Sequence, residues 1–193
     1  MYSIAAPHAK GKSAEDNIFA ANNRAIALAK EIGVENVTNA TVGSILEEDG
    51  SLVVLDVVKQ ELKNLTPPEF CAYAPIKGYD EFLKDCIDQC FGKSRPEGYI
   101  DACATPGGTG VLHHVVHNYS EPGDEVLITD WHWGAYDSLI DDNNRKVRTF
   151  SFLTSDGHFN AASFKENVED ILKKQDNIVI ILNGIANNPT GYC

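Results

Sequence analysis

A glycine-rich segment at residues 105–110, with the sequence TPGGTG, stands between an expected short strand at 99–105 and an expected apolar helix at 107–119. The free N–H groups and the dipole at a helix N-terminus attract phosphate, and glycines let a ligand approach the backbone closely. Thr109 adds a hydroxyl donor. The segment matches neither the dinucleotide fingerprint G-x-G-x-x-G nor a Walker loop, which needs Gly-Lys-Ser/Thr. It predicts either a phosphate site or a tight turn whose glycines serve only steric needs.

Two other segments with polar or aromatic side chains also follow expected strands. Residues 130–134, DWHWG, come after a strand at 125–129, and residues 187–191, NNPTG, come after an apolar run at 178–182. Ligands of open parallel sheets bind beyond the carboxyl ends of the strands, where a tryptophan can stack on a flat ring and an asparagine can donate to a ligand oxygen. Tryptophans that fill the core and a simple turn are the alternatives. Together, the three segments suit a phosphorylated aromatic ligand.

Histidines and cysteines give a weaker indication of a metal site. His113 and His117 are four residues apart in the expected helix, which is a spacing used by metal ligands. No carboxylate at a matching position supports them and the helix is otherwise apolar, so we interpret both as packing or surface residues and expect no metal. The chain has five cysteines, an odd number, and no secretory signal precedes them. This indicates reduced thiols and a cytoplasmic location.

The elements that must position these segments alternate along the second half of the chain. Four expected strands, at 99–105, 125–129, 147–152 and 178–182, are separated by three expected helices, at 107–119, 134–141 and 160–174. Strands separated by helices imply crossover connections. We therefore predict the α/β class, a three-layer α/β/α arrangement with a mostly parallel sheet, preceded by an N-terminal helical and extended segment. No element follows the last strand to cover the sheet, so we expect a chain that is incomplete or depends on a partner.

Composition excludes several classes of function. The 193 residues carry a net charge of −12 and no run of Lys and Arg, which argues against binding to nucleic acid or to an anionic membrane. No apolar stretch approaches the roughly 18 residues of a membrane-spanning helix. Residues 1–13 lack the apolar centre of a signal peptide. The hydrophobic share of 43% is ordinary for a soluble globular chain, so we expect a globular domain.

From about residue 39 to residue 191 the chain resembles the fold type I pyridoxal 5'-phosphate (PLP) aminotransferases, in their aspartate/aromatic subgroup. The resemblance rests on the NPTG motif at 188–191 after an apolar run, on the glycine-rich turn about eighty residues earlier, and on Trp133-Gly134 between them. It implies that the sheet belongs to an incomplete large, PLP-binding domain. Residues 1–50 would be an N-terminal segment within the small domain, and residues 51–193 would be the first part of the large domain.

The resemblance also implies roles for single residues. Gly107, Gly108 and Thr109 would hold the phosphate of PLP. Trp133 would stack on the pyridine ring, Asn188 would bond the phenolic oxygen of that ring, and both would contact the substrate. The first position of this phosphate turn is commonly serine in aspartate aminotransferases, so glycine at 107 removes one side-chain donor while the backbone donors remain.

Two further residues would complete the implied site. Gly43 matches the glycine near the substrate carboxylate. Tyr73, in the sequence AYAPIKG at 72–78, matches a tyrosine that reaches the phosphate of the neighbouring subunit's cofactor. The tyrosine therefore implies a homodimer with shared active sites.

The family places its cofactor-binding lysine, the Asp that pairs with the pyridine nitrogen, a Tyr beside the phenolic oxygen and the substrate-binding arginines after the NPTG motif. We therefore expect these residues beyond Cys193, no catalytic residue within this chain, and no turnover by the chain alone. Lys77, Lys93 and Lys146 stand in polar contexts, which are typical of surface lysines.

The resemblance implies that the parent protein is a PLP-dependent aminotransferase. Such an enzyme transfers an amino group between an amino acid, here of the aspartate/aromatic type, and a 2-oxo acid by a ping-pong mechanism. Two alternatives stay open. One is another fold type I PLP enzyme, such as a lyase or decarboxylase, against which the context of Tyr73 and Trp133 argue mildly. The other is a non-catalytic half that only binds a partner or a phosphorylated ligand.

Overall fold

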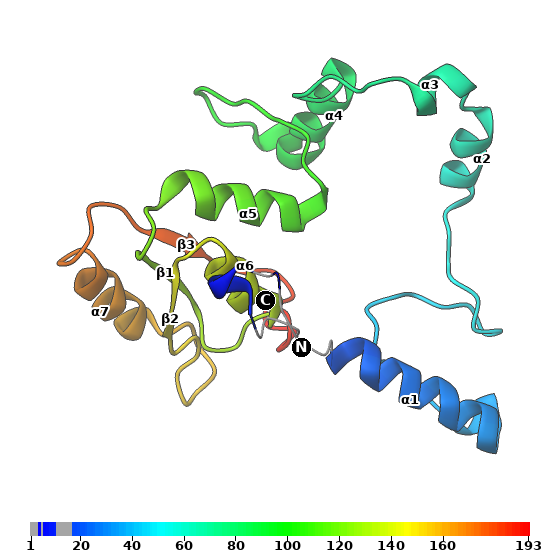
Figure 1. Ribbon diagram of the computed structural model, residues 1–193, viewed down its shortest axis with the longest axis horizontal. Coiled ribbons are helices and arrows are strands. Elements are labelled where there is room, and N and C mark those ends of the chain that lie inside the picture. Colours follow the sequence, from blue (N-terminus) through cyan, green and yellow to red (C-terminus); the bar gives the residue numbers. More distant parts are fainter. Residues whose placement is uncertain (1–3, 5, 11–16) are drawn as a thin grey trace. The chain divides into compact units, whose positions relative to one another are not determined.

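The computed structural model describes residue 4, residues 6–10 and residues 17–193. The chain divides into two compact units, Met1–Ala72 and Tyr73–Cys193 (Figure 1). The domain boundary predicted at residue 50 concerns the completed fold of the family and stays a prediction.

The first unit consists of helices joined by extended chain. Its helices are α1 (Asn17–Ile32), α2 (Asp56–Asn64) and α3 (Pro67–Cys71), with 3-10 turns at Pro7–Ala9 and Val34–Asn36. Between α1 and α2 the chain turns back on itself, and Leu46 and Leu52 form an antiparallel bridge. A capping box between Thr66 and Glu69 begins α3, because each residue satisfies a backbone N–H of the other.

The second unit holds a three-stranded sheet in the order β2-β1-β3, with all strands parallel. The strands are β1 (Glu125–Thr129), β2 (Lys146–Phe150) and β3 (Val179–Ile181). The helices are α4 (Asp80–Phe91), followed by a 3-10 turn at Gly92–Ser94, then α5 (Gly107–Tyr119), α6 (Ala135–Asp142) and α7 (Ala161–Ile171). The predicted α/β fold with a parallel sheet is therefore confirmed.

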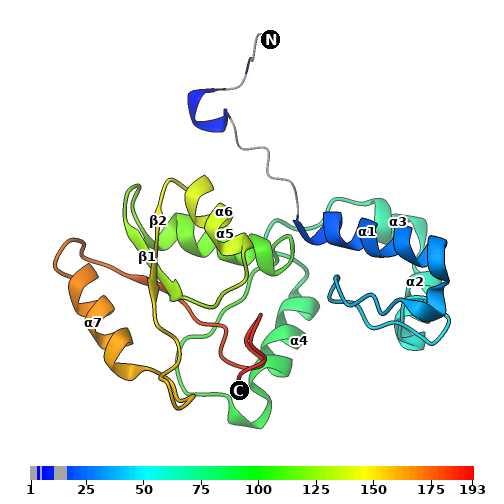
Figure 2. The same cartoon turned by 90° about the horizontal axis from the view of Figure 1, so that it is seen from below.

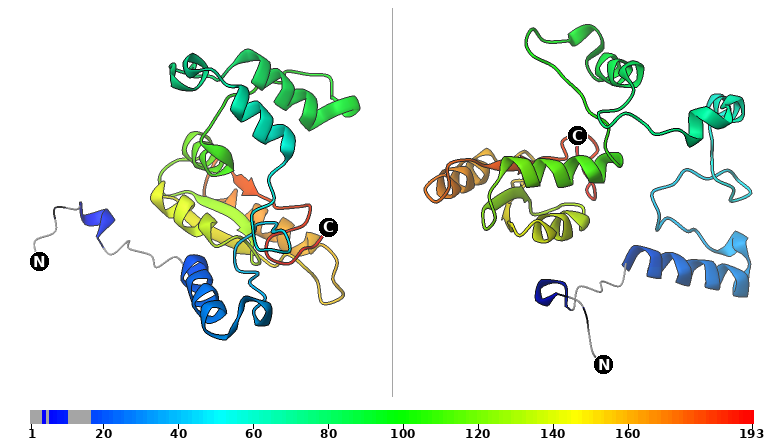
Figure 3. Two further views of the ribbon diagram at one scale, coloured as in Figure 1. Left: turned by 90° about the vertical axis from the view of Figure 1, so that its right-hand side faces the viewer. Right: turned by 45° about the horizontal axis from the view of Figure 1, so that its top comes forward.

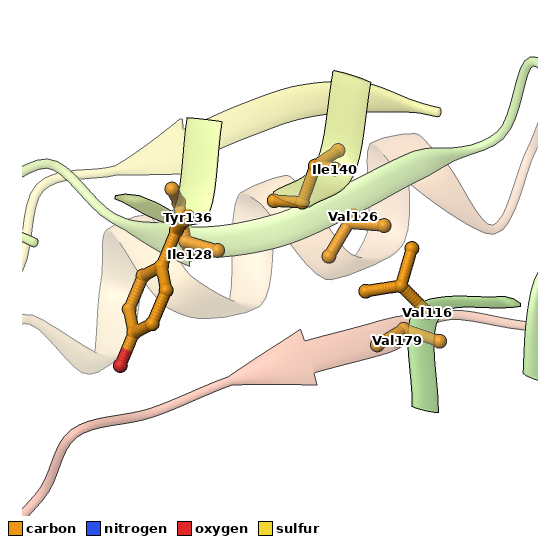
Figure 4. Packing of buried hydrophobic residues seen from close by; sticks show 6 residues of the cluster. All are labelled: Val116, Val126, Ile128, Tyr136, Ile140 and Val179. Atoms are coloured by element: carbon orange, nitrogen blue, oxygen red, sulfur yellow. The ribbon is translucent and has the colours of Figure 1, made fainter. Parts of the chain in front are cut away.

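Alternating side chains of β1 divide the core into two halves. Val126 and Ile128 pack in a cluster toward α5 and α6 (Figure 4), which also contains the buried residues Val116, Tyr136, Ile140 and Val179. Leu127 points to the opposite face and packs with Phe150, Phe152 and Ile171 near α7. Helices therefore cover both faces of the sheet, and the second unit has three layers (Figure 2).

One predicted strand is not a strand. Residues 99–105 form no β pairing with any described strand, and the N–H of Ala104 donates instead to the carbonyl of Lys77 at 2.7 Å. A β-strand exists only where a neighbouring strand accepts and donates its backbone hydrogen bonds. The pattern of side chains at 99–105 indicates an extended backbone, but it contains no information about whether a neighbour is present.

Two global expectations can be compared with the described residues. No helix among residues 4, 6–10 and 17–193 is long and apolar enough to cross a membrane. All five cysteines are free and exposed: Cys71, Cys86, Cys90, Cys103 and Cys193.

Substitutions at one pair of register partners test the burial of β1. Val126 on β1 is fully buried, whereas its partner Val147 on β2 is 36% exposed. We expect Val126→Ala to lower the free energy of unfolding by about 2 kcal/mol, because lost transfer energy and a residual cavity add. Val147→Ala should cost less than about 1 kcal/mol. Urea denaturation of both variants measures the difference, and equal losses would contradict the assigned core.

Candidate functional site at the carboxyl edge of the sheet

The two predicted strand-end segments meet at one edge of the sheet. β1 and β3 are adjacent and parallel, so the segments that follow them, 130–134 and 182–191, begin side by side. From β1 the chain passes to β2 on one side and then crosses back to β3 on the other. Ligands of open α/β sheets bind at such a reversal of direction, beyond the carboxyl ends of the strands. The loop after β3 and the N-terminus of α5 lie at this edge (Figure 3).

The N-terminus of α5 has free backbone donors. Its N-cap position is Pro106, which offers no side-chain cap. The N–H of Gly107 donates to Thr105 at 2.7 Å and that of Gly110 to Pro106 at 3.2 Å. The N–H groups of Gly108 and Thr109 make no hydrogen bond within the described chain. Two unpaired donors at the positive end of a helix form a suitable place for an anion.

A different structural constraint applies at each of the three glycines of this turn. Gly107 has a φ of +65°, a left-handed conformation that other residues rarely adopt. A Cβ at Gly110 would lie 2.7 Å from Cδ of Pro106, so the turn itself excludes a side chain there. At Gly108 a Cβ would meet nothing within 4 Å, and φ is not positive. Because no contact with the described residues explains Gly108, the purely steric interpretation of the turn does not account for it, and the space beside it is open.

A buried arginine holds the other end of α5. Arg145, 7% exposed, donates from its guanidinium to the carbonyls of His117, at 3.2 Å, and Ser120, and to the Ser120 hydroxyl at 3.1 Å. A cation among the last carbonyls of a helix complements the negative end of its dipole. Arg145 thereby fixes the position of α5. Sequence reasoning missed it, because a single Arg before a strand has no distinguishing spacing.

The two tryptophans after β1 lie in different surroundings. Trp133 is half-buried and packs against the cluster of Figure 4 beside Leu112 and Val115, with its ring perpendicular to that of Tyr136 at 5.7 Å. Trp131 is 58% exposed and does not belong to either core cluster. Core packing and ligand stacking were the two interpretations of these residues. Trp133 is held by the core on one side and still reaches the surface at the carboxyl edge.

Polar contacts fix the loop that carries Trp133. One carboxylate oxygen of Asp130 accepts from the N–H groups of Trp131 and Phe152, both at 2.9 Å. Nδ1 of His132 lies 2.9 Å from the carbonyl of Thr129, and because a carbonyl can only accept, Nδ1 carries the proton. Nε2 of His132 faces the carboxylate of Asp137 at 3.2 Å.

The two asparagines after β3 also differ in burial, but here the second of the pair is the exposed one. Asn187 is 1% exposed, and its amide donates to the carbonyl of Asn183 and accepts from the hydroxyl of Thr190 at 2.8 Å. Asn188 is exposed, and only its backbone N–H is bonded, to the Asn183 side chain at 2.9 Å. Its side-chain amide makes no hydrogen bond in the described chain. The loop therefore uses Asn187 for its own structure and leaves Asn188 available at the edge.

Tyr73 is fully exposed, and the segment that carries it is fastened to the chain just before the glycine-rich turn. Nζ of Lys77 lies 2.7 Å from a carboxylate oxygen of Asp101, and this hydrogen-bonded pair raises the pKa of Lys77 and lowers that of Asp101. Gly78 has a φ of +109°, and a Cβ there would lie 2.9 Å from Cβ of Ala104. Tyr73 makes no contact with Gly107, Trp133 or Asn188 in this chain.

Gly43 belongs to the first unit, whereas the edge of the sheet belongs to the second. It lies in a bend, is exposed, and a Cβ there would meet nothing within 4 Å. The preceding turn is held by Asn39, whose amide donates to Asn22 at 2.8 Å and accepts from the hydroxyl of Thr41 at 2.7 Å.

The histidine pair on α5 is engaged within the protein. His113 and His117 stack with centroids 6.1 Å apart. The amide nitrogen of Asn143 donates to the Leu139 carbonyl at 2.8 Å and approaches Nδ1 of His113 at 3.1 Å. Nδ1 then accepts and the ring proton sits on Nε2, so neither nitrogen of this tautomer offers a lone pair to a metal. Within the described ranges, no three His, Cys, Asp or Glu side chains are grouped to hold a metal ion.

Comparisons with known proteins identify the family of the chain. The sequence profile of the family aminotransferase class I and II matches residues 35–193. The chain is 29% identical over 160 residues to the chloroplastic aspartate aminotransferase of Arabidopsis thaliana, covering 79% of this chain and 35% of that protein. It is 25% identical over 159 residues to the aromatic-amino-acid aminotransferase of Pseudomonas aeruginosa, covering 78% and 39%.

A solved structure extends the similarity to the whole chain. The crystal structure of an aminotransferase from Anaerococcus prevotii superposes with a TM-score of 0.95 at 34% identity, covering 99% of this chain and 47% of that one. The chain therefore spans less than half the length of each of these relatives.

Two glycine substitutions separate the steric from the open positions of the turn. Gly110→Ala places a Cβ against Pro106 and should lower the free energy of unfolding by about 1–3 kcal/mol. The thermal unfolding midpoint of the ligand-free protein should therefore fall by several degrees. Gly108→Ala meets no atom and replaces a glycine within a helix, so the midpoint should stay or rise slightly. Calorimetry on both variants checks this, and a loss in Gly108→Ala equal to that in Gly110→Ala would contradict the open space at 108.

Proposed function

Because the chain belongs to the aminotransferase class I and II family, we propose that it is part of a PLP-dependent aminotransferase acting on an amino acid of the aspartate or aromatic type and a 2-oxo acid. The observation that carries the proposal is the open N-terminus of α5 at the edge of the sheet where Trp133 and Asn188 also lie. Its two unpaired N–H groups and its unexplained Gly108 suit a phosphate, and the two side chains suit a polar ring.

The described residues fit PLP, each with a distinct task. The N–H groups of Gly108 and Thr109, with the Thr109 hydroxyl, would bind the phosphate, and Gly107 shapes the turn that exposes them. Trp133 would stack on the pyridine ring and Asn188 would donate to its phenolic oxygen. PLP, when bound, acts as an electron sink for bond changes next to an amino nitrogen. The chain's own contribution is to hold and orient that ring.

Two of the described lysines, Lys77 and Lys146, are not placed for proton transfer at that ring. Lys77 is paired with Asp101, and Lys146 lies exposed at the start of β2, the end of the strand opposite to the site. We propose that the cofactor-binding lysine, the acidic partner of the ring nitrogen and the substrate-binding arginines belong to protein outside residues 1–193, and that this chain has no turnover alone. The share of each relative that the chain covers, 35–47%, supports this division.

The edges of the sheet indicate where the rest of the fold joins. β2 carries Lys146 and Arg148, and charged side chains are typical of strands that remain at an edge. β3 is Val-Ile-Ile and is followed by Leu182, 50% exposed. An apolar edge strand without charges is a place where further strands pair. We propose that the sheet continues beyond β3.

The remaining proposals concern assembly and location. An exposed Tyr73 on a fastened segment is what a residue that reaches a neighbouring subunit's cofactor requires, so we propose a homodimer with shared sites. Gly43 is assigned to the surroundings of the substrate carboxylate. The exposed free thiols support a cytoplasmic location, although relatives with chloroplastic names also match.

A product assay tests the proposed reaction. The full-length protein that contains this chain, supplied with PLP, aspartate or an aromatic amino acid and a 2-oxo acid, should form a new amino acid and a new 2-oxo acid. Initial rates should give parallel double-reciprocal lines, as expected for ping-pong transfer. Release of ammonia or carbon dioxide instead would assign a lyase or decarboxylase. A chain limited to residues 1–193 should show no turnover.

The neighbouring tryptophans provide a matched pair for the binding site. In the full-length protein, Trp133→Ala should weaken PLP binding about 3- to 10-fold by removing the stacking surface, whereas Trp131→Ala should leave affinity unchanged. Trp133→Phe keeps an aromatic face and should retain most of the affinity. Equilibrium titration of PLP by absorbance measures all three. An equal loss in Trp131→Ala and Trp133→Ala would contradict the assignment of Trp133.

A further inference from the structure

Tyr136 has a buried ring and a hydroxyl without a partner. It lies in the first turn of α6, is 7% exposed, and packs against Ile128 in the cluster of Figure 4. Its backbone N–H donates to the carbonyl of Trp133 at 2.9 Å, but its hydroxyl makes no hydrogen bond in the described chain. An unpaired hydroxyl could still be sealed from solvent, but this one is accessible to it. The polar end of this side chain therefore opens to the surface.

The hydroxyl opens at the candidate site. Figure 4 shows it pointing out of the cluster at the end where Ile128 lies, away from Val116 and Val126. Ile128 precedes the last residue of β1, so this end is the carboxyl edge of the sheet. The Tyr136 ring stands at 85° to Trp133 and lies parallel to His132 at 6.2 Å. Three rings with one free hydroxyl thus border the place where the flat ligand would stack.

Packing alone does not account for the hydroxyl. A phenylalanine would fill the same apolar space against Ile128, whereas the tyrosine also places a hydroxyl at the surface. Buried tyrosines usually find a hydrogen-bond partner for the hydroxyl. At Tyr136 no described residue supplies that partner, and the hydroxyl faces the candidate site instead.

We propose that Tyr136 is a positioning residue whose hydroxyl hydrogen-bonds the polar rim of the ring that stacks on Trp133. The inference rests on the proposed function and adds to it. Stacking on Trp133 fixes the plane of a ring but leaves the ring free to rotate within that plane. The phosphate anchor at Gly108 and Thr109 restrains one point of the ligand, and a hydrogen bond from Tyr136 at a second point would set its rotation.

Two matched tyrosine variants of the full-length protein test the inference. Tyr136→Phe removes only the hydroxyl. We expect it to weaken PLP binding about 3- to 10-fold, as the loss of one hydrogen bond does, with an unchanged thermal midpoint of the PLP-free protein. Tyr119→Phe is the control: Tyr119 is 69% exposed at the last residue of α5, at the opposite end of that helix from the glycine-rich turn, and its PLP affinity should equal that of the wild type.

Inorganic phosphate separates the proposed contact from a general disturbance of the site. Phosphate ions would bind the proposed anion site at α5 but have no ring. The affinity of phosphate, measured by its competition with PLP, should therefore be the same in Tyr136→Phe as in the wild type. Equal PLP affinity of Tyr136→Phe and wild type would overturn the inference, as would a lowered thermal midpoint with weaker phosphate binding, which marks a structural role. A wild-type protein that binds no PLP would instead overturn the proposed function itself.

Discussion

Burial of β1 on both faces is the constraint from which the architecture of the second unit follows. Val126, Leu127 and Ile128 are fully buried, and their alternation sends apolar side chains to both sides of the sheet. Helices must cover both faces, because parallel strands are joined by crossovers. Crossover connections between parallel strands are right-handed. Because the chain moves from β1 to β2 on one side and then back to β3 on the other, α6 and α7 lie on opposite faces of the sheet. The same reversal places the carboxyl ends of β1 and β3 side by side at one edge of the sheet.

The candidate anion site depends on how firmly α5 is held. Val116 packs into the cluster on β1, and Arg145 bonds the carbonyls at the C-terminal end of the helix. The helix therefore cannot shift along the sheet without breaking a buried hydrogen-bond network and losing apolar contacts. Its N-terminus, with the free N–H groups of Gly108 and Thr109, is thereby held at the edge. Donors that are already in place need no ordering when an anion binds, which preserves binding energy.

The polar side chains at this edge are of two kinds: some are hydrogen-bonded within the protein and others are not. The side chains of Asp130 and Asn187 form hydrogen bonds within their own part of the protein. The side-chain amide of Asn188 and the hydroxyl of Tyr136 have no partner in the described chain. The inward groups make the loops rigid, and the outward groups are left for contacts with something else. Exposed polar groups without a partner among the described residues are free to bond a ligand. The edge thus has the composition of a binding surface, with rigid supports and a small number of free donors.

The sequence by itself determined the class of fold, the parallel sheet and the three segments that carry chemistry. Apolar runs, glycine-rich turns and the NPTG motif are local patterns, and strand direction follows from the alternation of strands and helices. The resemblance already implied roles for Trp133 and Asn188, and only the tertiary structure decided what physically distinguishes each of them from its neighbour. Trp131 and Trp133, and Asn187 and Asn188, differ in burial and partners that come from distant segments. Residues 99–105 were expected as a strand because side-chain pattern shows an extended backbone, whereas pairing requires a neighbour. The role of Arg145 depends on its contact with the end of α5, and that of Tyr136 on its place at the edge of the sheet. Spacing along the chain shows neither.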